Sequence, residues 1–218
     1  MSGLVLGIDT SSVVCAGLAA DGEVVGSLVV PDTRAHAEQL TPLIRRLLDE
    51  SGAGLPDLAS IAVGVGPGPF TGLRVGVVAA TVLAEVLQLP IKGVCSLDVL
   101  ALQAVAAGLV QRGGSGSAGD FVVASDARRK EWYWATYHAD GSRDAGPFVT
   151  APDGRPALPQ VGPVTATPLE LDAGRLAALA AVLPDAGLEP LYLRRPDAEV
   201  PTARKSTLLP PRLARRPR

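Results

Sequence analysis

The chain has 218 residues, 47% of them apolar, and its formal net charge is −2. This apolar content can bury a sizeable core in one large domain or two small ones. The near balance of charge excludes a strong overall field that would draw the whole body of the protein to nucleic acid.

Three strands are predicted in the first 30 residues, at 4–8, 13–19 and 23–30. Asp21 and Gly22 separate the last two strands and favour a tight hairpin, because both central positions of such a turn adopt positive φ. The first strand runs into Asp9, Thr10 and Ser11, which form a polar turn with several hydrogen-bonding groups.

Helices and strands alternate in the next segment. One face of a predicted helix over 36–51 carries five apolar side chains, those of Leu40, Leu43, Ile44, Leu47 and Leu48. Pro42 interrupts this helix and predicts either a start near Thr41 or a kink. A buried strand over 61–65, a helix over 72–88 and a strand over 91–94 follow. Ser96 is placed to cap a helix that runs to about residue 107.

The pattern of the first 30 residues recurs from residue 121. A strand over 121–125 ends in Asp126, Ala127 and Arg128, a second strand covers 131–137, and Asp140-Gly141 predicts another hairpin. The spacing from the acidic turn to the Asp-Gly pair is twelve residues in the first copy and fourteen in the second. Identity between the copies is low, so coincidence stays open as the alternative to two similar α/β halves.

The order of three strands, helix, strand and helix is typical of one lobe of the actin-like ATPases. The predicted fold is therefore α/β, with two ribonuclease-H-like lobes of which the second is smaller and looser. We expect an N-terminal lobe at 1–111, a Gly- and Ser-rich linker at 112–120, a C-terminal lobe at 121–200 and a basic tail at 201–218. A solvated terminus is the preferred interpretation of the tail, and contact with tRNA or a partner is the alternative.

The run GVGPGPFTGLRVG at 64–76 poses the question of nucleotide binding. Pro67 and Pro69 have no N–H to donate, and no lysine follows Gly72 as it would in a Walker loop. The glycine spacing also fails to fit the dinucleotide fingerprint. We interpret the run as a rigid turn that starts a helix, with Thr71 as its cap. Arg74 can meet an anion from the first turn of this helix, and pairing with a neighbouring acid is the alternative.

The helix after this turn has only two charged residues between 73 and 89, Arg74 and Glu85. A helix that is apolar all round must be covered on both sides, and leftover apolar surface would form an association site. Coverage within the chain is the alternative. The candidate partner-interface residues are Leu40, Leu43, Ile44, Leu47, Arg74, Val77, Val78 and Thr81.

The two cysteines, Cys15 and Cys95, lie far apart and form no CxxC pair. We expect buried thiols in a reducing compartment. The N-terminus lacks the positive segment and long apolar run of a signal peptide. The longest apolar stretch, 75–87, is shorter than the roughly 20 residues that cross a bilayer. We therefore expect a soluble, cytoplasmic protein with no membrane association.

Several stretches, in the correct order and over nearly the whole chain, resemble the TsaB family of tRNA threonylcarbamoyladenosine biosynthesis proteins, formerly described as glycoprotease-like. These stretches are GIDTSS, RAHAEQLTPLI, GVGPGPFTGLRVG, PIKGVCSLDVLA, SDARRKEWYWATY and EPLYLRRPDA. Residues 139–172 match poorly, and the structure of this segment is the least certain expectation.

The resemblance implies an actin-like fold and the role of a non-catalytic partner. Proteins of this family bind TsaD, a larger paralogue, and act with the small ATPase TsaE. Together they transfer a threonylcarbamoyl group to the adenosine beside the anticodon of tRNAs that read A-starting codons. The helices over 36–51 and 72–88 are expected to dock on the matching helices of TsaD, and the same surface is expected to form a homodimer when the chain is alone. Contact with tRNA is expected only through the complex.

The resemblance implies that Ser96 and Leu100 stand where the paralogue has the two histidines of its metal-binding HxxxH pair. His36 and His138 are isolated, so no metal site is expected. In actin-like ATPases the acidic turns flank the phosphates, which makes a nucleotide cleft the candidate role of Asp9, Thr10, Ser11, Asp126 and Arg128. We expect no ATP hydrolysis and no resident cofactor, and a vestigial cleft or a nucleotide at a subunit junction is the alternative.

Other functions compete with this prediction. A stand-alone actin-like ATPase or small-molecule kinase is supported by the two acidic turns. A peptidase lacks both a metal pair and an evident nucleophile–base set. Direct tRNA binding rests on the basic tail alone.

Overall fold

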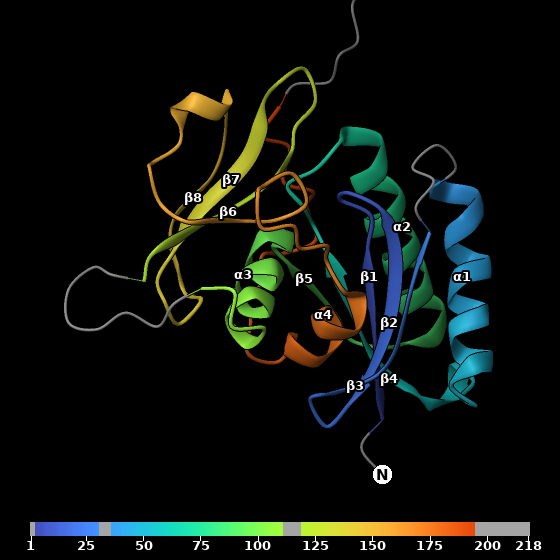
Figure 1. The fold of residues 1–218 in the computed structure, drawn as a ribbon. Helices are drawn as coiled ribbons and strands as arrows, with labels where there is room; N and C mark the ends of the chain where they lie inside the picture. The colour runs from blue at the N-terminus through green and yellow to red at the C-terminus, as the bar shows by residue number, and fades with distance from the viewer. Residues whose placement is uncertain (1–2, 31–35, 111–118, 195–218) are drawn as a thin grey trace, which may run out of the picture.

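The computed structural model describes residues 3–30, 36–110 and 119–194. It contains a five-stranded and a four-stranded β-sheet, with helices on and between them (Figure 1). Most of the predicted linker at 112–120 and the whole tail at 201–218 lie outside the described residues.

The first sheet has the strand order β3-β2-β1-β4-β5. The first three strands form an antiparallel meander, and β4 and β5 run parallel to β1. Asp21 and Gly22 have φ values of 54° and 80°, which confirms the tight hairpin between β2 and β3. The bounds, within three residues of those predicted, are β1 Leu4–Asp9, β2 Val14–Ala20, β3 Glu23–Val30, β4 Leu58–Gly64 and β5 Ile91–Val94.

The second sheet repeats the connectivity of the first. Its order is β8-β7-β6-β9, with β6, β7 and β8 antiparallel and β9 parallel to β6, as β4 is to β1. Between β8 and β9 it has a single 3-10 turn, η2 (Pro152–Gly154), where the first lobe has a full helix. The bounds are β6 Phe121–Asp126, β7 Trp132–Tyr137, β8 Arg143–Thr150 and β9 Gln160–Val161. The predicted α/β fold of two ribonuclease-H-like lobes, the second smaller, is confirmed.

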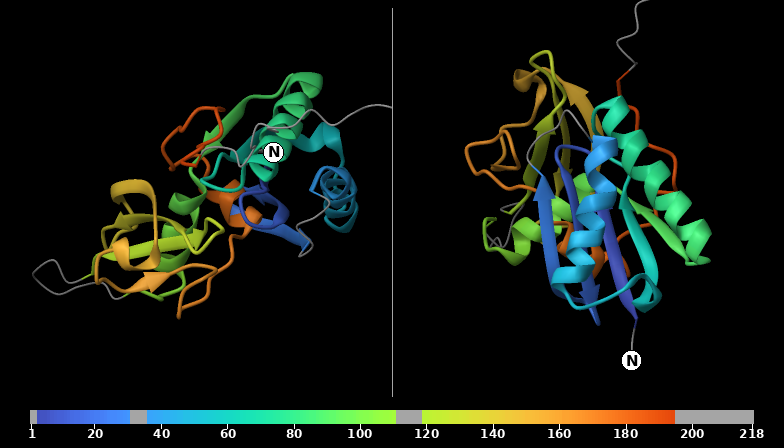
Figure 2. Two further views of the ribbon diagram at one scale, coloured as in Figure 1. Left: turned by 90° about the horizontal axis from the view of Figure 1, so that it is seen from above. Right: turned by 90° about the vertical axis from the view of Figure 1, so that its right-hand side faces the viewer.

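Helices cover both faces of the first sheet. On one face, the sheet is covered by α1 (His36–Glu50) and α2 (Phe70–Leu87) (Figure 2). The two helices enclose a core with Leu6, Ile8 and other side chains of the strands. On the other face, α4 (Ala173–Leu179) and α3 (Ser96–Ala106) share a second core with the inner face of the second sheet. Because both faces are covered, β1, β2 and β4 read as nearly continuous apolar runs.

Helix α4 follows the second sheet in sequence but packs against β1, β2 and β3 of the first. The approach is close enough to require glycine in the strands: a Cβ atom on Gly7 would lie 2.2 Å from the carbonyl oxygen of Ala173, and one on Gly17 would lie 2.0 Å from the nitrogen of Gly174. The lobe boundaries of the sequence analysis remain a prediction. This helix, from the range assigned to the C-terminal lobe, completes the core of the N-terminal one.

A buried polar cluster joins α3 to the second sheet. The hydroxyl of Tyr137 donates to Asp98 Oδ1 at 2.8 Å, and Arg143 Nε lies 3.4 Å from the same oxygen. Burial raises the pKa of Asp98, and the Arg143 guanidinium acts in the opposite direction. These contacts link strands β7 and β8 to the first lobe.

Helix α1 begins at His36, as the predicted range has it, and contains Pro42, because its apolar face packs on the sheet and outweighs one missing backbone bond. Two helix caps differ from the predictions. The cap of α2 is Pro69, which leaves Thr71 exposed in the first turn. The cap of α3 is Cys95, so Ser96 is the first helical residue and its hydroxyl bonds elsewhere.

Candidate functional site

The carboxyl group of Asp9, at the end of β1, is buried among hydroxyl groups of the chain. Its Oδ1 accepts hydrogen bonds from Ser11 N at 2.7 Å and Ser11 Oγ at 2.6 Å. Its Oδ2 accepts one from Ser96 Oγ at 2.5 Å. Burial raises the pKa of Asp9, while the bonds from Ser11 and Ser96 lower it. Both carboxyl oxygens are therefore engaged by groups of the chain itself.

Thr10 ties the same turn to the start of α2. Its hydroxyl donates to the carbonyl oxygen of Gly72 at 2.8 Å in a buried contact. A Cβ atom on Gly76 would lie 2.2 Å from Thr10 Oγ1, and one on Gly64 would lie 1.7 Å from Asp9 Oδ2. The predicted candidates Asp9, Thr10 and Ser11 thus lie together, packed against glycines of β4 and α2.

The backbone of the glycine–proline turn bonds within the chain. Gly66 donates its N–H to Ser96 Oγ at 3.2 Å and accepts from Ser96 N at 2.7 Å. Tyr133 of the second sheet donates its hydroxyl to the carbonyl oxygen of Gly68 at 3.3 Å. These contacts fit a rigid turn held from both lobes. One of them uses the N–H of Gly66, the kind of group that a phosphate-binding loop directs at its ligand.

The second acidic turn pairs with its own arginine. Asp126 Oδ1 accepts from Arg128 N at 2.8 Å, and Arg128 Nε lies 3.8 Å from Asp126 Oδ2. Both side chains are exposed. Arg194 donates to the carbonyl oxygen of Ala127 at 2.7 Å and so fixes the C-terminal part of the described chain against this turn. A nucleotide cleft between the two acidic turns remains the alternative to the expected absence of a cofactor.

Among residues 3–30, 36–110 and 119–194 there is no group of three or more His, Cys, Asp or Glu that could hold a metal ion. Ser96 and Leu100, at the positions that the resemblance implied for metal ligands, are buried. His138 is exposed, 3.2 Å from Asp120. The side chain of His36 lies outside what the structure describes.

Both thiols are buried and free, as predicted. Burial raises the pKa of Cys95 to about 12 and that of Cys15 above its ordinary value. A thiol is a nucleophile only as the thiolate, so neither cysteine is suited to peptidase chemistry at neutral pH.

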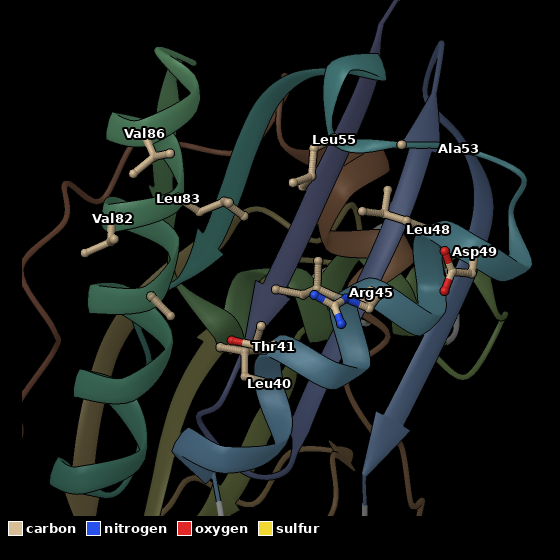
Figure 3. A pocket seen from close by; sticks show the side chains of 13 residues that line it. Leu40, Thr41, Arg45, Leu48, Asp49, Ala53, Leu55, Val82, Leu83 and Val86 are labelled. Atoms are coloured by element: carbon tan, nitrogen blue, oxygen red, sulfur yellow. The ribbon is translucent and has the colours of Figure 1, made fainter.

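A second candidate site is an apolar groove of about 540 Å³ between α1 and α2 (Figure 3). From α1 it is lined by Leu40, Ile44 and Leu48, and from α2 by Leu83 and Val86, among others. Figure 3 shows Val82, Leu83 and Val86 along α2 opposite Leu40 and Leu48 of α1, with Leu55 closing one end. The groove is open, apolar and bounded by two rigid helices, which is a surface suited to a protein segment.

The predicted interface residues divide between core and surface. Those in the core are Leu40, Leu43, Ile44, Leu47 and Val77. The first four face the first sheet because the apolar face of α1 is the one that the sheet covers. Arg74, Val78 and Thr81 are exposed on α2. The guanidinium of Arg74 lies 5.2 Å from the centroid of the Phe70 ring.

The sequence analysis missed most of the exposed apolar stripe of α2. Val78, Val82 and Val86 lie four residues apart on one side of the helix and are 56%, 56% and 72% exposed. The i, i+4, i+8 spacing of valines from Val78 onward could have predicted this stripe from the sequence.

By length and mean hydropathy, 1.7 over 18 residues, Phe70–Leu87 also meets the criteria for a membrane-spanning helix, yet its buried side packs on β4.

Comparison with protein families identifies one that matches more than half of the chain. A family described as TsaD, tRNA N6-adenosine threonylcarbamoyltransferase, matches residues 26–153. An uncharacterized protein of Mycobacterium tuberculosis is 41% identical over 211 residues, covering 89% of this chain and 93% of the relative. Protein TsaB of Escherichia coli, named for tRNA threonylcarbamoyladenosine biosynthesis, is 34% identical over 136 residues, covering 62% of this chain and 55% of the relative.

Two solved structures share the fold. YeaZ from Pseudomonas aeruginosa is 30% identical with a TM-score of 0.64, covering 84% of this chain and 92% of that one. An uncharacterized Pseudomonas aeruginosa protein, described as similar to the peptidase YeaZ, is 31% identical with a TM-score of 0.67, covering 89% and 100%. Together with the matched family model, these similarities show that the chain belongs to the TsaD/TsaB family, which includes the YeaZ proteins.

Proposed function

We propose that the chain is a non-catalytic subunit in the threonylcarbamoylation of tRNA. In this role it binds the larger paralogue TsaD, works with TsaE, and supports the transfer of the threonylcarbamoyl group to the adenosine beside the anticodon. When the chain is alone, the surface that binds TsaD forms a homodimer instead. The proposal places the protein in the cytoplasm, where tRNA is modified, and brings it to tRNA through the complex.

The exposed stripe of Val78, Val82 and Val86 beside the apolar groove carries this proposal. Three valines in line on one helix offer apolar surface that water solvates unfavourably, and a helix from a partner can cover both the stripe and the groove. Arg74 and Thr81 lie on the same helix and supply a polar rim. The buried residues predicted for the interface support the groove from beneath.

The Asp9 site supports a non-catalytic role. A carboxylate that binds a metal–phosphate complex must present an oxygen to it, whereas the Asp9 carboxyl group is fully buried and each of its oxygens already accepts a hydrogen bond from Ser11 or Ser96. Gly64 and Gly76 pack against Asp9 and Thr10. Binding a nucleotide there would require these contacts to open.

Reconstitution of tRNA modification tests the proposal. TsaD and TsaE are assayed with and without this chain, and we expect modified tRNA only when the chain is present. Modification at the full rate without it would contradict the proposal.

A stand-alone ATPase or small-molecule kinase is the second candidate, favoured by the repeated acidic turns that follow β1 and β6. Calorimetry with ATP and Mg²⁺, followed by a phosphate-release assay on the isolated chain, distinguishes it. Turnover by the isolated chain would replace the proposed role with this one.

A further inference from the structure

Helix α2 carries its two charged side chains on its exposed side, one before and one after the valines at 78 and 82. Arg74 and Glu85 are both exposed. They are eleven residues apart, which is roughly 16 Å along an α-helix. Among residues 3–30, 36–110 and 119–194, neither side chain forms an ion pair with another residue. Both charges can therefore pair with groups of a second molecule.

The exposed side of α2 is symmetric around a point midway between residues 79 and 80. Arg74 and Glu85 lie equally far from this point along the helix, and so do Val78 and Thr81. When two copies of a helix pack antiparallel around a two-fold axis through such a point, each residue meets its mate in the other copy. Arg74 of one copy then meets Glu85 of the other, and this ion pair forms twice.

The charges also select the direction of packing. A parallel pair of α2 helices in register would place Arg74 against Arg74 and Glu85 against Glu85. Like charges that face each other across an interface cost several kcal/mol, whereas the antiparallel pair brings opposite charges together at both ends. The arrangement of charge on α2 is thus complementary to a second copy of α2 in the antiparallel direction.

Apolar surface fills the space between the two ion pairs. Val78 and Val82 are each 56% exposed, and Val86 is 72% exposed. The groove beside α2 continues this surface to Leu83 and to Leu40 of α1 (Figure 3). A two-fold contact uses the same apolar patch from both copies, so both patches leave water in one association step.

The Arg74 side chain is supported within its own chain. Its guanidinium lies 5.2 Å from the centroid of the Phe70 ring. The Phe70 ring in turn lies 4.8 Å from the ring of Tyr192, measured between centroids. Contact with a packed ring restricts the arginine before association, which reduces the entropy that it loses when it pairs with a carboxylate.

We propose that two copies of the chain associate through α2 in the antiparallel direction, with an Arg74–Glu85 ion pair at each end of the contact. This inference rests on the proposed function, in which the chain dimerises when TsaD is absent, and it adds the register of the dimer and the charges that select it. A different partner requires no symmetry in the charges of α2. The symmetric placement of Arg74 and Glu85 therefore identifies a second copy as the occupant.

Charge reversal tests the register. Sedimentation equilibrium measures the dimer dissociation constant of the full chain and its variants. Arg74→Glu places two carboxylates together at both ends of the contact, and Glu85→Arg places two guanidinium groups together. Each variant alone should therefore dimerise at least about tenfold more weakly than the wild type.

Two combinations should restore the affinity. In an equimolar mixture of the two single variants, each ion pair is formed again with its charges exchanged. In a chain that carries both substitutions, the same pairs form between identical copies. Both combinations should dimerise with the affinity of the wild type, and loss of folding in the single variants could not produce this recovery.

The matched controls are Arg175→Glu on α4 and Glu23→Arg on β3. They make the same changes of charge at exposed positions outside α2 and should leave the dimer affinity unchanged. Thermal unfolding of each variant measures its fold separately, and we expect little change in Tm because Arg74 and Glu85 are exposed.

Three results would overturn the inference. The first is a wild-type chain that stays monomeric up to its highest soluble concentration. The second is a dimer that neither single reversal weakens, or that the mixture fails to restore. The third is a mixture that dimerises more tightly than the wild type, because this result indicates a parallel pair.

The proposed function is tested separately by reconstitution with TsaD and TsaE. If modification of tRNA requires the chain but the dimer does not respond to charge reversal, the proposed function stands and this register is wrong. If the mixture restores the dimer but modification proceeds at the full rate without the chain, the register stands and the proposed function is wrong.

Discussion

Replacing Val82 with arginine tests whether the exposed stripe of α2 is the partner surface. Val82 is 56% exposed, so a partner that covers it removes about half of its apolar surface from water. Complete burial of a valine stabilises by about 1.5–2 kcal/mol, and the lost contact therefore accounts for about 1 kcal/mol. An uncompensated buried charge adds about 3 kcal/mol or more. The expected weakening is about 4 kcal/mol, or roughly a thousandfold in Kd.

Calorimetric titration and co-elution with TsaD measure this effect, and thermal unfolding measures the variant alone. Val82 is exposed in the isolated chain, so the new arginine is solvated there and the isolated variant should keep its Tm. Val29→Arg is the matched control, because Val29 is also 56% exposed but lies on β3. If Val82→Arg folds normally and binds TsaD with unchanged affinity, the stripe is not the interface.

Two further predictions concern the Asp9 site. Gly76→Ala should lower the free energy of unfolding by about 1–3 kcal/mol, because its Cβ would lie 2.2 Å from Thr10 Oγ1; urea denaturation showing the gain of about 1 kcal/mol usual for a helical glycine would contradict this packing. Burial raises the pKa of Asp9 above its ordinary 3.8. Protonation of Asp9 therefore favours the native state, and this contribution to stability is fully present below pH 3.8. It is lost as the pH rises through the raised pKa. The stability of the wild type relative to Asp9→Asn should therefore increase as the pH falls toward 3.8, and a difference that does not vary with pH in denaturation experiments would show that Asp9 is not buried as described.

The sheets could be predicted because their signals are local. Short apolar runs and the Asp21-Gly22 hairpin indicate each strand by its near neighbours, and the repeated pattern from residue 121 predicts the repeated topology that the structure contains. The helix caps were predicted less well. A polar residue near a helix start can cap the helix, but its side chain can equally bond to a residue far away in the sequence. Ser96 illustrates this, because its hydroxyl bonds to Asp9, 87 residues away.

The candidate interface shows why the remainder could not be predicted. A periodic apolar face such as that of Leu40, Leu43 and Leu47 is the face a sheet buries, so its periodicity predicts core rather than contact. The side available to a partner consists of the apolar residues left over on α2, Val78 and Val82 among them. Their exposure depends on how α1 and α2 cross the sheet, which no local pattern specifies.

The position of α4 has a consequence for how the protein folds during its synthesis on the ribosome. The strand surface around Gly7 and Gly17 emerges early, but residues 173–179, which cover it, are translated only after the whole second sheet. Until α4 is translated, the nascent first lobe exposes an apolar surface. The two lobes therefore cannot complete their folding one after the other. Completion of folding is therefore coupled to about the last fifth of translation, and a gene fragment that ends at the predicted linker should yield an aggregating product.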